Sequence, residues 1–135
     1  MLAPLGRINQ ITSQIISGAI EVHRALGPGL LEAVYAHCLA SELRRGGMKI
    51  ESELKIPVIY KGVAMDCVYK MDLLVEGLVV VEMKSVEIVL PVHRAQLLTE
   101  LKLAAKPAGL LLNFNVPVLK DGITRLLNRA ALQPV

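Results

Sequence analysis

Aromatic side chains are scarce in this chain of 135 residues, which has no tryptophan, three tyrosines and one phenylalanine. So few ring faces argue against the base-stacking platform of a single-strand nucleic-acid binder. Cysteine is equally scarce, and Cys38 and Cys67 are too few and too far apart for a disulfide framework or a zinc site. We expect both to be reduced thiols in the core of a cytoplasmic protein.

Long apolar runs are also missing. Charged or polar residues interrupt every hydrophobic stretch before it reaches the roughly 18 residues that a membrane span needs. Arg7 and the polar residues after it interrupt the segment where a secretion signal would be apolar. We therefore expect no membrane association.

The charge excess is small, while the hydrophobic content is large. Fifteen Lys and Arg face twelve Asp and Glu, and the net charge of +3 permits an anionic partner without requiring one. Hydrophobic residues make up 53% of the chain and charged residues 20%, which excludes disorder. The length fits a single domain over residues 1–135.

Hydrophobic periodicity predicts an α/β domain. Apolar residues recur every three or four positions in two early segments and then every second position, so the pattern changes from helix to strand. The expected order, α-α-β-β-β-α-β-α, comprises helices at 8–26 and 30–45, strands at 50–60, 63–74 and 78–84, a helix from Pro91 to 106, a strand at 109–114, and a last short helix capped by Asp121. A strand meander followed by a helical crossover implies a mixed β-sheet flanked by helices.

Two charges interrupt the most apolar of these strands. Glu82 and Lys84 follow a run of three valines and, being two residues apart, project from the same face. Burying them without partners or a ligand would cost free energy. One interpretation is an ion pair at the fraying end of the strand, and the other is a functional site.

Asp72, on the preceding strand, favours the functional interpretation. A three-residue loop at 75–77, with Gly77 in a left-handed conformation, would pair Asp72 with Val80 and place it diagonal to Glu82 on one face. A two-residue turn would send the two carboxylates to opposite faces. The site hypothesis therefore requires an odd-numbered loop or a bulge.

Converging carboxylates repel each other, and a hard divalent cation with oxygen ligands removes that repulsion. Such a cation lowers the pKa of bound water and neutralises charge on a phosphoryl oxygen, while the ammonium of Lys84 can steer the water or stabilise the same charge. Asp72, Glu82 and Lys84 therefore predict phosphodiester hydrolysis. Lys70 shares a face with Asp72 and could meet a phosphate entering the cleft.

Four motifs carry a resemblance to a known family. They are Gly29-Leu30-Leu31-Glu32-Ala33-Val34-Tyr35, Tyr69-Lys70-Met71-Asp72-Leu73-Leu74-Val75, Val81-Glu82-Met83-Lys84-Ser85 and Leu112-Asn113-Phe114-Asn115. In this order they closely resemble the GxxExxY protein family, which is placed in the PD-(D/E)XK nuclease superfamily, and the likeness runs from the first helix to about Asn128. The resemblance implies a restriction-endonuclease-like fold and a magnesium-dependent phosphodiesterase site, with Mn²⁺ as a substitute for Mg²⁺.

The resemblance also implies roles for individual residues. Asp72 and Glu82 would be metal ligands, with the backbone carbonyl of Met83 as a third and Glu32 as the helix-borne acidic residue beside them. Lys84 would be the catalytic lysine.

The crossover helix carries one match to the superfamily and one departure from it. Gln96 stands where nuclease branches of the superfamily often place a glutamine, but Glu100 stands where some of them place a tyrosine. His93, one turn before Gln96, is expected to cap the helix or lie on the surface, and structural roles suffice for His23 and His37.

Simpler interpretations exist for the first motif. Glu32 could stabilise the positive end of its helix, or accept a hydrogen bond as in a capping box. Tyr35 could hold Glu32 by a hydrogen bond or pack in the core. Gly29 could allow the backbone to approach the sheet closely, or could only start the helix.

The leading hypothesis is a cytoplasmic, magnesium-dependent nuclease that acts on DNA or RNA. The alternative is a catalytically inactive module that keeps the scaffold, with Glu82 and Lys84 as an ion pair and a homodimer that buries a hydrophobic face. A metal enzyme acting on a small phosphorylated substrate is a third hypothesis, because a fold does not fix a substrate.

Overall fold

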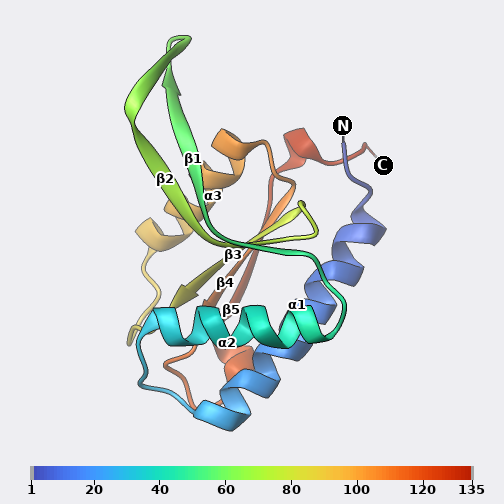
Figure 1. Ribbon diagram of the computed structural model, residues 1–135, viewed down its shortest axis with the longest axis vertical. Helices are drawn as coiled ribbons and strands as arrows, with labels where there is room; N and C mark the ends of the chain where they lie inside the picture. The colour runs from blue at the N-terminus through green and yellow to red at the C-terminus, as the bar shows by residue number, and fades with distance from the viewer. Residues whose placement is uncertain (1, 135) are drawn as a thin grey trace.

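Five strands form one mixed sheet in the order β1-β2-β3-β4-β5 (Figure 1). The computed structural model describes residues 2–134. Its elements are α1 (Leu5–Leu26), α2 (Glu32–Arg45), β1 (Ile50–Tyr60), β2 (Val63–Val75), β3 (Val79–Lys84), α3 (Pro91–Ala104), β4 (Ala108–Asn113), the short 3-10 helix η1 (Leu119–Gly122), β5 (Ile123–Leu127) and the 3-10 helix η2 (Arg129–Ala131). Only β3 and β4 are parallel, because α3 carries the chain back between them. The expected α/β class with a restriction-endonuclease-like mixed sheet is confirmed.

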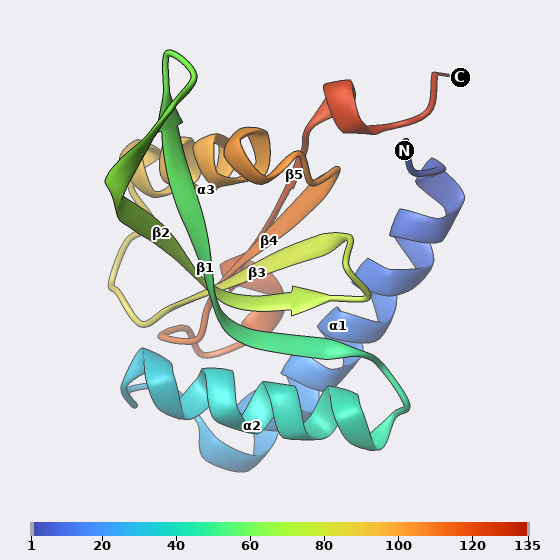
Figure 2. The ribbon, with the colours of Figure 1, turned by 45° about the horizontal axis from the view of Figure 1, so that its top comes forward.

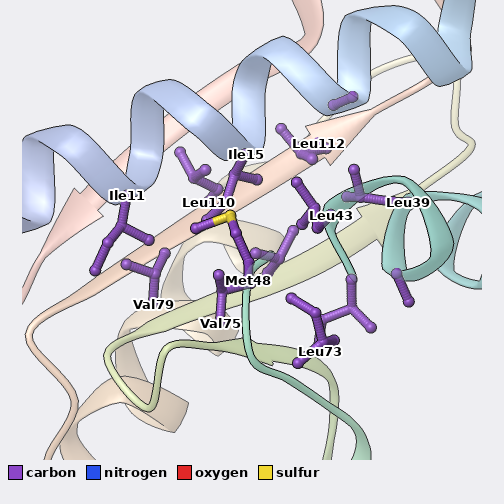
Figure 3. Packing of buried hydrophobic residues seen from close by; sticks show 14 of the residues in the cluster. Ile11, Ile15, Leu39, Leu43, Met48, Leu73, Val75, Val79, Leu110 and Leu112 are labelled. Atoms are coloured by element: carbon purple, nitrogen blue, oxygen red, sulfur yellow. The ribbon is translucent and has the colours of Figure 1, made fainter. Parts of the chain in front are cut away.

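Helices cover both faces of this sheet. α1 and α2 pack on one face, where Ile11 and Ile15 of α1 meet Val79, Leu110 and other strand residues (Figure 3). α3 packs on the opposite face through Leu97 and Leu101. The isoleucine stripe of α1 is buried because it faces the sheet with helical spacing. Among residues 2–134, no helix is both long enough and apolar enough to cross a membrane.

The sequence predicted a last short helix after Asp121. This prediction is wrong, because residues 123–127 form a strand. β5 pairs antiparallel with β4, and only η1, which contains Asp121, is helical before it. Gly122, the last residue of η1, lies so close to the end of β4 that a Cβ atom there would clash with the carbonyl oxygen of Asn113. An apolar segment of five residues is too short for periodicity to separate helix from strand, and pairing with β4 decided the outcome.

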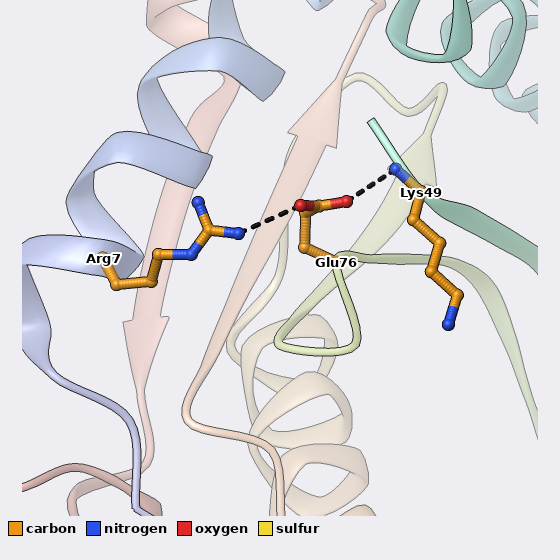
Figure 4. A network of polar contacts seen from close by, with 3 residues as sticks. All are labelled: Arg7, Lys49 and Glu76. Atoms are coloured by element: carbon orange, nitrogen blue, oxygen red, sulfur yellow. Dashed lines mark hydrogen bonds and ion pairs between the residues drawn. The ribbon is translucent and has the colours of Figure 1, made fainter. Parts of the chain in front are cut away.

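The turn between β2 and β3 has the odd number of residues that the site hypothesis required. Its three residues run from Glu76 to Leu78, and both Glu76 and Gly77 have left-handed backbones, with φ of 54° and 68°. The register differs by two positions from the expected one, because Val75 pairs with Val79. The carboxylate of Glu76 accepts hydrogen bonds from the Lys49 backbone and the Arg7 guanidinium, at 2.6 and 3.0 Å, and these contacts fix the turn (Figure 4).

The outer halves of β1 and β2 form a hairpin that projects beyond the rest of the sheet (Figures 1 and 2). Residues 61–68 are all exposed, although the sequence predicted that one face of this strand would be buried. None of the described helices covers residues 61–68, so alternation of apolar residues does not lead to burial here. Cys67 is therefore exposed rather than in the core, whereas Cys38 on α2 is half-buried.

Candidate functional site

One pocket of about 500 Å³ collects residues from α2 and the first three strands. Glu32 reaches it from α2, Asp72 from β2, and Glu82, Met83 and Lys84 from β3. The sequence hypothesis placed these five residues together, and the structure brings them to one pocket. The remaining residues of its lining are Ala33, Ala36, His37, Ser52, Glu53, Lys70 and Leu73.

Asp72 and Glu82 are cross-linked where the ladder between β2 and β3 ends. The last regular pair is Leu73 with Val81, so continuation of the register places Asp72 directly beside Glu82. Side chains then replace the main-chain bonds: Met83 donates its N–H to Oδ2 of Asp72 at 2.9 Å, and Asp72 donates its N–H to Oε1 of Glu82 at 3.4 Å. Each carboxylate therefore keeps its second oxygen outside these two hydrogen bonds.

Glu100, on α3, adds a third acid to this pair. Its side chain is buried, with 6% of the residue exposed. Burial, together with the negative charges of Asp72 and Glu100, raises the pKa of Glu82 to about 9. Burial also raises the pKa of Glu100, to about 6, against the lowering effect of a hydrogen bond with Glu82 and of the Lys84 charge. Glu82 is consequently protonated at neutral pH when no cation is near.

The two ends of adjacent parallel strands hold Lys84 in place. Phe114 donates its backbone N–H to the carbonyl of Lys84 at 2.9 Å. The buried amide of Asn113 bonds both main-chain groups of Val86, donating at 2.9 Å and accepting at 3.1 Å. The half-buried side chain of Lys84 makes no ion pair within 4 Å in the described part of the chain. The Glu82–Lys84 ion pair of the alternative interpretation is therefore absent from residues 2–134.

The loop before α2 explains most of the G-x-x-E-x-x-Y motif. The hydroxyl of Tyr35 donates to the carbonyl of Gly27 at 2.5 Å and accepts from the N–H of Leu30 at 3.1 Å. Its buried ring stacks on Phe114 with 4.2 Å between centroids, so Tyr35 fixes the loop and the core instead of holding Glu32. Gly29 has a φ of 92° and no atom within 4 Å of an added Cβ, so the motif needs its left-handed backbone, not close packing.

Glu32 opens α2, at the end of the helix that carries a partial positive charge. No side-chain hydrogen bond caps this helix, so the capping-box interpretation is wrong. The Glu32 carboxylate is exposed at the pocket.

Gln96 lies outside the pocket. It is exposed on α3, one turn before Glu100, and only Glu100 reaches the carboxylates. His93 caps α3 as expected, accepting the N–H of Leu90 through Nδ1 at 3.0 Å. His23 binds the carbonyl of Val116 through Nε2 at 2.8 Å, which is the structural role predicted for it.

Sequence reasoning missed three polar residues of the pocket. His37 lies one turn after Ala33 on α2, and a structural role had been expected for it. Ser52 and Glu53 come from β1, which the sequence treated only as a structural strand. Glu53 has a left-handed φ of 51° inside the strand, a conformation that a sequence pattern does not reveal.

The carboxylate oxygens of the pocket are the type of ligand that a hard divalent cation prefers. Residues 2–134 nevertheless contain no group of three or more His, Cys, Asp or Glu already arranged to bind a metal ion. Four acids line the pocket, Glu32, Glu53, Asp72 and Glu82, against the two lysines 70 and 84. An anionic substrate would be repelled by this excess of acids. A bound divalent cation would cancel that excess of negative charge and favour ionisation of Glu82, which burial and the neighbouring acids disfavour.

Comparison with known families gives one match. A sequence model described as the PD-(D/E)XK nuclease superfamily matches residues 9–126, which include every pocket residue. No curated protein and no solved structure matches the chain significantly.

Proposed function

Because this chain belongs to the PD-(D/E)XK nuclease superfamily, we propose that it is a magnesium-dependent nuclease that hydrolyses phosphodiester bonds of DNA or RNA. The observation that carries the proposal is the meeting of Asp72 and Glu82 at the end of the β2–β3 ladder, with Lys84 in the same pocket. Carboxylates on paired strands beside an ammonium are the groups that metal-assisted hydrolysis needs.

The residues that would hold Mg²⁺, or Mn²⁺ in its place, are Asp72, Glu82 and the main-chain carbonyl of Met83, with Glu32 on the opposite wall. Their oxygen donors fit a hard cation, and the raised pKa of Glu82 supports this assignment because burial and neighbouring acids disfavour its ionisation without a counter-charge. When bound, the cation would supply Lewis-acid activation of water and of the phosphoryl oxygen.

The side chains of the pocket have separate tasks in this proposal. Lys84 binds the scissile phosphate or orients the attacking water through Nζ, and the Asn113–Val86 hydrogen bonds keep its strand end in position. Glu100 adds negative charge next to Glu82. Gln96 acts only if α3 or the substrate moves, because it is exposed outside the pocket.

A cleavage assay tests the proposal. Purified wild-type protein and the Asp72→Asn, Glu82→Ala and Lys84→Ala variants are incubated with labelled single-stranded, duplex and branched DNA and RNA, with Mg²⁺ or Mn²⁺. Glu87→Gln, an exposed carboxylate outside the pocket, is the matched control. We expect metal-dependent cleavage by the wild type and the control, and none by the three variants. Metal-dependent cleavage that survives in all three variants would disprove the proposal.

We also propose that the chain belongs to the GxxExxY family within this superfamily. The support is the defined task of two motif residues, since Gly29 provides a left-handed backbone and Tyr35 ties the loop to the core. A matched pair of variants, Gly29→Ala and Gly6→Ala, tests this: the first should perturb α2 and the second should not, because Gly6 has open space and an ordinary helical position.

The second candidate function is an assembly module without turnover. The exposed apolar side chains of the hairpin favour it, since Ile59, Tyr60, Val63 and Val68 are each more than half exposed. Sedimentation of the protein over a range of concentrations tests it. A dimer that Ile59→Ser dissociates, together with the absence of cleavage, would replace the nuclease proposal.

A further inference from the structure

Lys55 and Lys70 stand directly opposite each other on the paired strands β1 and β2. Residues that are direct partners in an antiparallel pair share a face, with Cβ atoms about 5 Å apart. Both lysines are exposed. Like charges in this arrangement destabilise the pair unless an anion lies between or above them.

The one carboxylate paired with either lysine is Glu53, whose Oε2 lies 3.7 Å from Nζ of Lys70 among the described residues. Both side chains of that pair are more than half exposed, so the contact is weak. The backbone of Glu53 is left-handed, which is unfavourable for a residue with a Cβ atom. Local charges therefore neutralise the two lysines only in part.

Lys70 lines the catalytic pocket, whereas Lys55 lies outside its lining. The pair thus begins at the pocket and leads away from it along the hairpin. The next direct pair on this face, Pro57 with Val68, is uncharged and exposed. The opposite face of the hairpin, with Leu54 and Ile56, packs toward α3. Positive charge is consequently placed on the face that continues from the pocket.

We propose that Lys55 and Lys70 form a phosphate-binding subsite for the polynucleotide backbone beside the scissile phosphodiester. This inference rests on the proposed function, because it extends the same pocket to its substrate. The subsite contacts a neighbouring phosphate, since the reacting one must lie at Asp72, Glu82 and Lys84. The exposed apolar pair next to it faces the sugar of the following nucleotide.

Binding measurements test the subsite separately from catalysis. Affinity for a labelled oligonucleotide is measured without divalent cation, over a range of salt concentrations, for the wild type and the Lys55→Ala, Lys70→Ala and double variants. Lys102→Ala, an exposed lysine on α3, is the control with the same change in charge. Each subsite variant should bind several-fold more weakly, with the salt slope reduced by about one per lysine, and with a melting temperature equal to or above that of the wild type.

A second probe locates the phosphate. A series of oligonucleotides carries one neutral methylphosphonate at successive positions, and one position should weaken wild-type binding while leaving the double variant unaffected. Equal loss of affinity in Lys102→Ala and in the single subsite variants, or no position with this behaviour, would overturn the subsite. Lysine-dependent binding without any cleavage would instead overturn the nuclease proposal and retain the subsite. Cleavage together with binding that does not depend on the two lysines would overturn the subsite and retain the nuclease proposal.

Discussion

The backbone amide of Met83 lies 2.9 Å from Oδ2 of Asp72, so a side chain closes the ladder between β2 and β3 at the point where a main-chain carbonyl would otherwise accept. This single hydrogen bond both positions the Asp72 carboxylate and pairs the two strands. A change at Asp72 should therefore affect both chemistry and stability, and the two effects can be separated.

Asp72→Ala should lower the free energy of unfolding by about 1–2 kcal/mol, because the backbone amide of buried Met83 loses its acceptor. Asp72→Asn keeps an acceptor oxygen and should be closer to the wild type in stability. Cleavage should fall about 100-fold or more in both. Denaturant unfolding and initial rates measure the two quantities, and equal stability of the Ala and Asn variants would contradict this role of the carboxylate.

The metal-free protein should lose stability as the pH rises from about 4.5 to 9. The folded pKa of Glu82 is raised to about 9 from an unfolded value near 4.5, so the folded state binds more protons over this range and unfolding releases them. The free energy of unfolding should therefore be about 3 kcal/mol lower at pH 7 than at pH 4.5, because it falls by roughly 1.4 kcal/mol per pH unit. Thermal or urea unfolding across this pH range, in the presence of a chelator, measures the slope.

Glu82→Gln should flatten this pH dependence and raise stability above the wild type at pH 8, because the neutral amide carries no desolvated charge. Glu100→Gln is the comparison, since its pKa of about 6 confines its own contribution to the range from 4.5 to 6. A Glu82→Gln protein less stable than the wild type at pH 8 would show that the Glu82 carboxyl is ionised and compensated in the fold.

Binding of Mg²⁺ or Mn²⁺ at pH 7 should release about one proton, because Glu82 is protonated before the cation arrives and must ionise to coordinate it. Calorimetry in two buffers with different heats of ionisation counts the protons. Affinity should rise with pH up to about 9, and Asp72→Asn should remove the binding heat. A pH-independent affinity would rule out Glu82 as a ligand.

Lys84→Ala should reduce cleavage about 100-fold or more and change stability by less than about 0.5 kcal/mol, because its side chain makes no ion pair with a described carboxylate. Asn113→Ala, in contrast, should lower the free energy of unfolding by about 1–3 kcal/mol, because both hydrogen bonds to Val86 are lost. Hydrogen exchange at residues 85–90 distinguishes them, since only the Asn113 variant should expose that segment.

Periodicity was sufficient to predict the three α-helices, because each buries one stripe against the sheet, and the inner strands were recognised by their continuous apolar runs. The odd-numbered turn followed from the need to place Asp72 and Glu82 on one side, and the structure has that turn with a register two positions away. Residues 123–127 escaped prediction because a short apolar run fits either a helix or a strand, and the pairing with β4 that makes it a strand is not visible in its own pattern.

The pocket was predictable where charge stood against an apolar background, as at Glu82 and Lys84, where strand pairing could be argued, as at Asp72, and by resemblance, as at Glu32. His37 and Ser52 lie on ordinary amphipathic elements, so nothing in their local pattern marked them. Gln96 was predicted by resemblance, but it is exposed. Glu100, one turn later, is the buried residue that lies beside the carboxylates. Cys67 was misplaced because the sequence does not reveal where a hairpin extends past its covering helices.

The projecting hairpin also leaves β1 as a free border of the sheet. An unpaired strand with exposed apolar side chains is a template onto which another chain can add by backbone pairing, the first step toward fibrils. Pro57 interrupts that border because it has no N–H to donate, and Lys55 beside it adds charge. Lys55, one of the two lysines of the proposed subsite, therefore also protects this edge strand, together with Pro57, against amyloid-like growth.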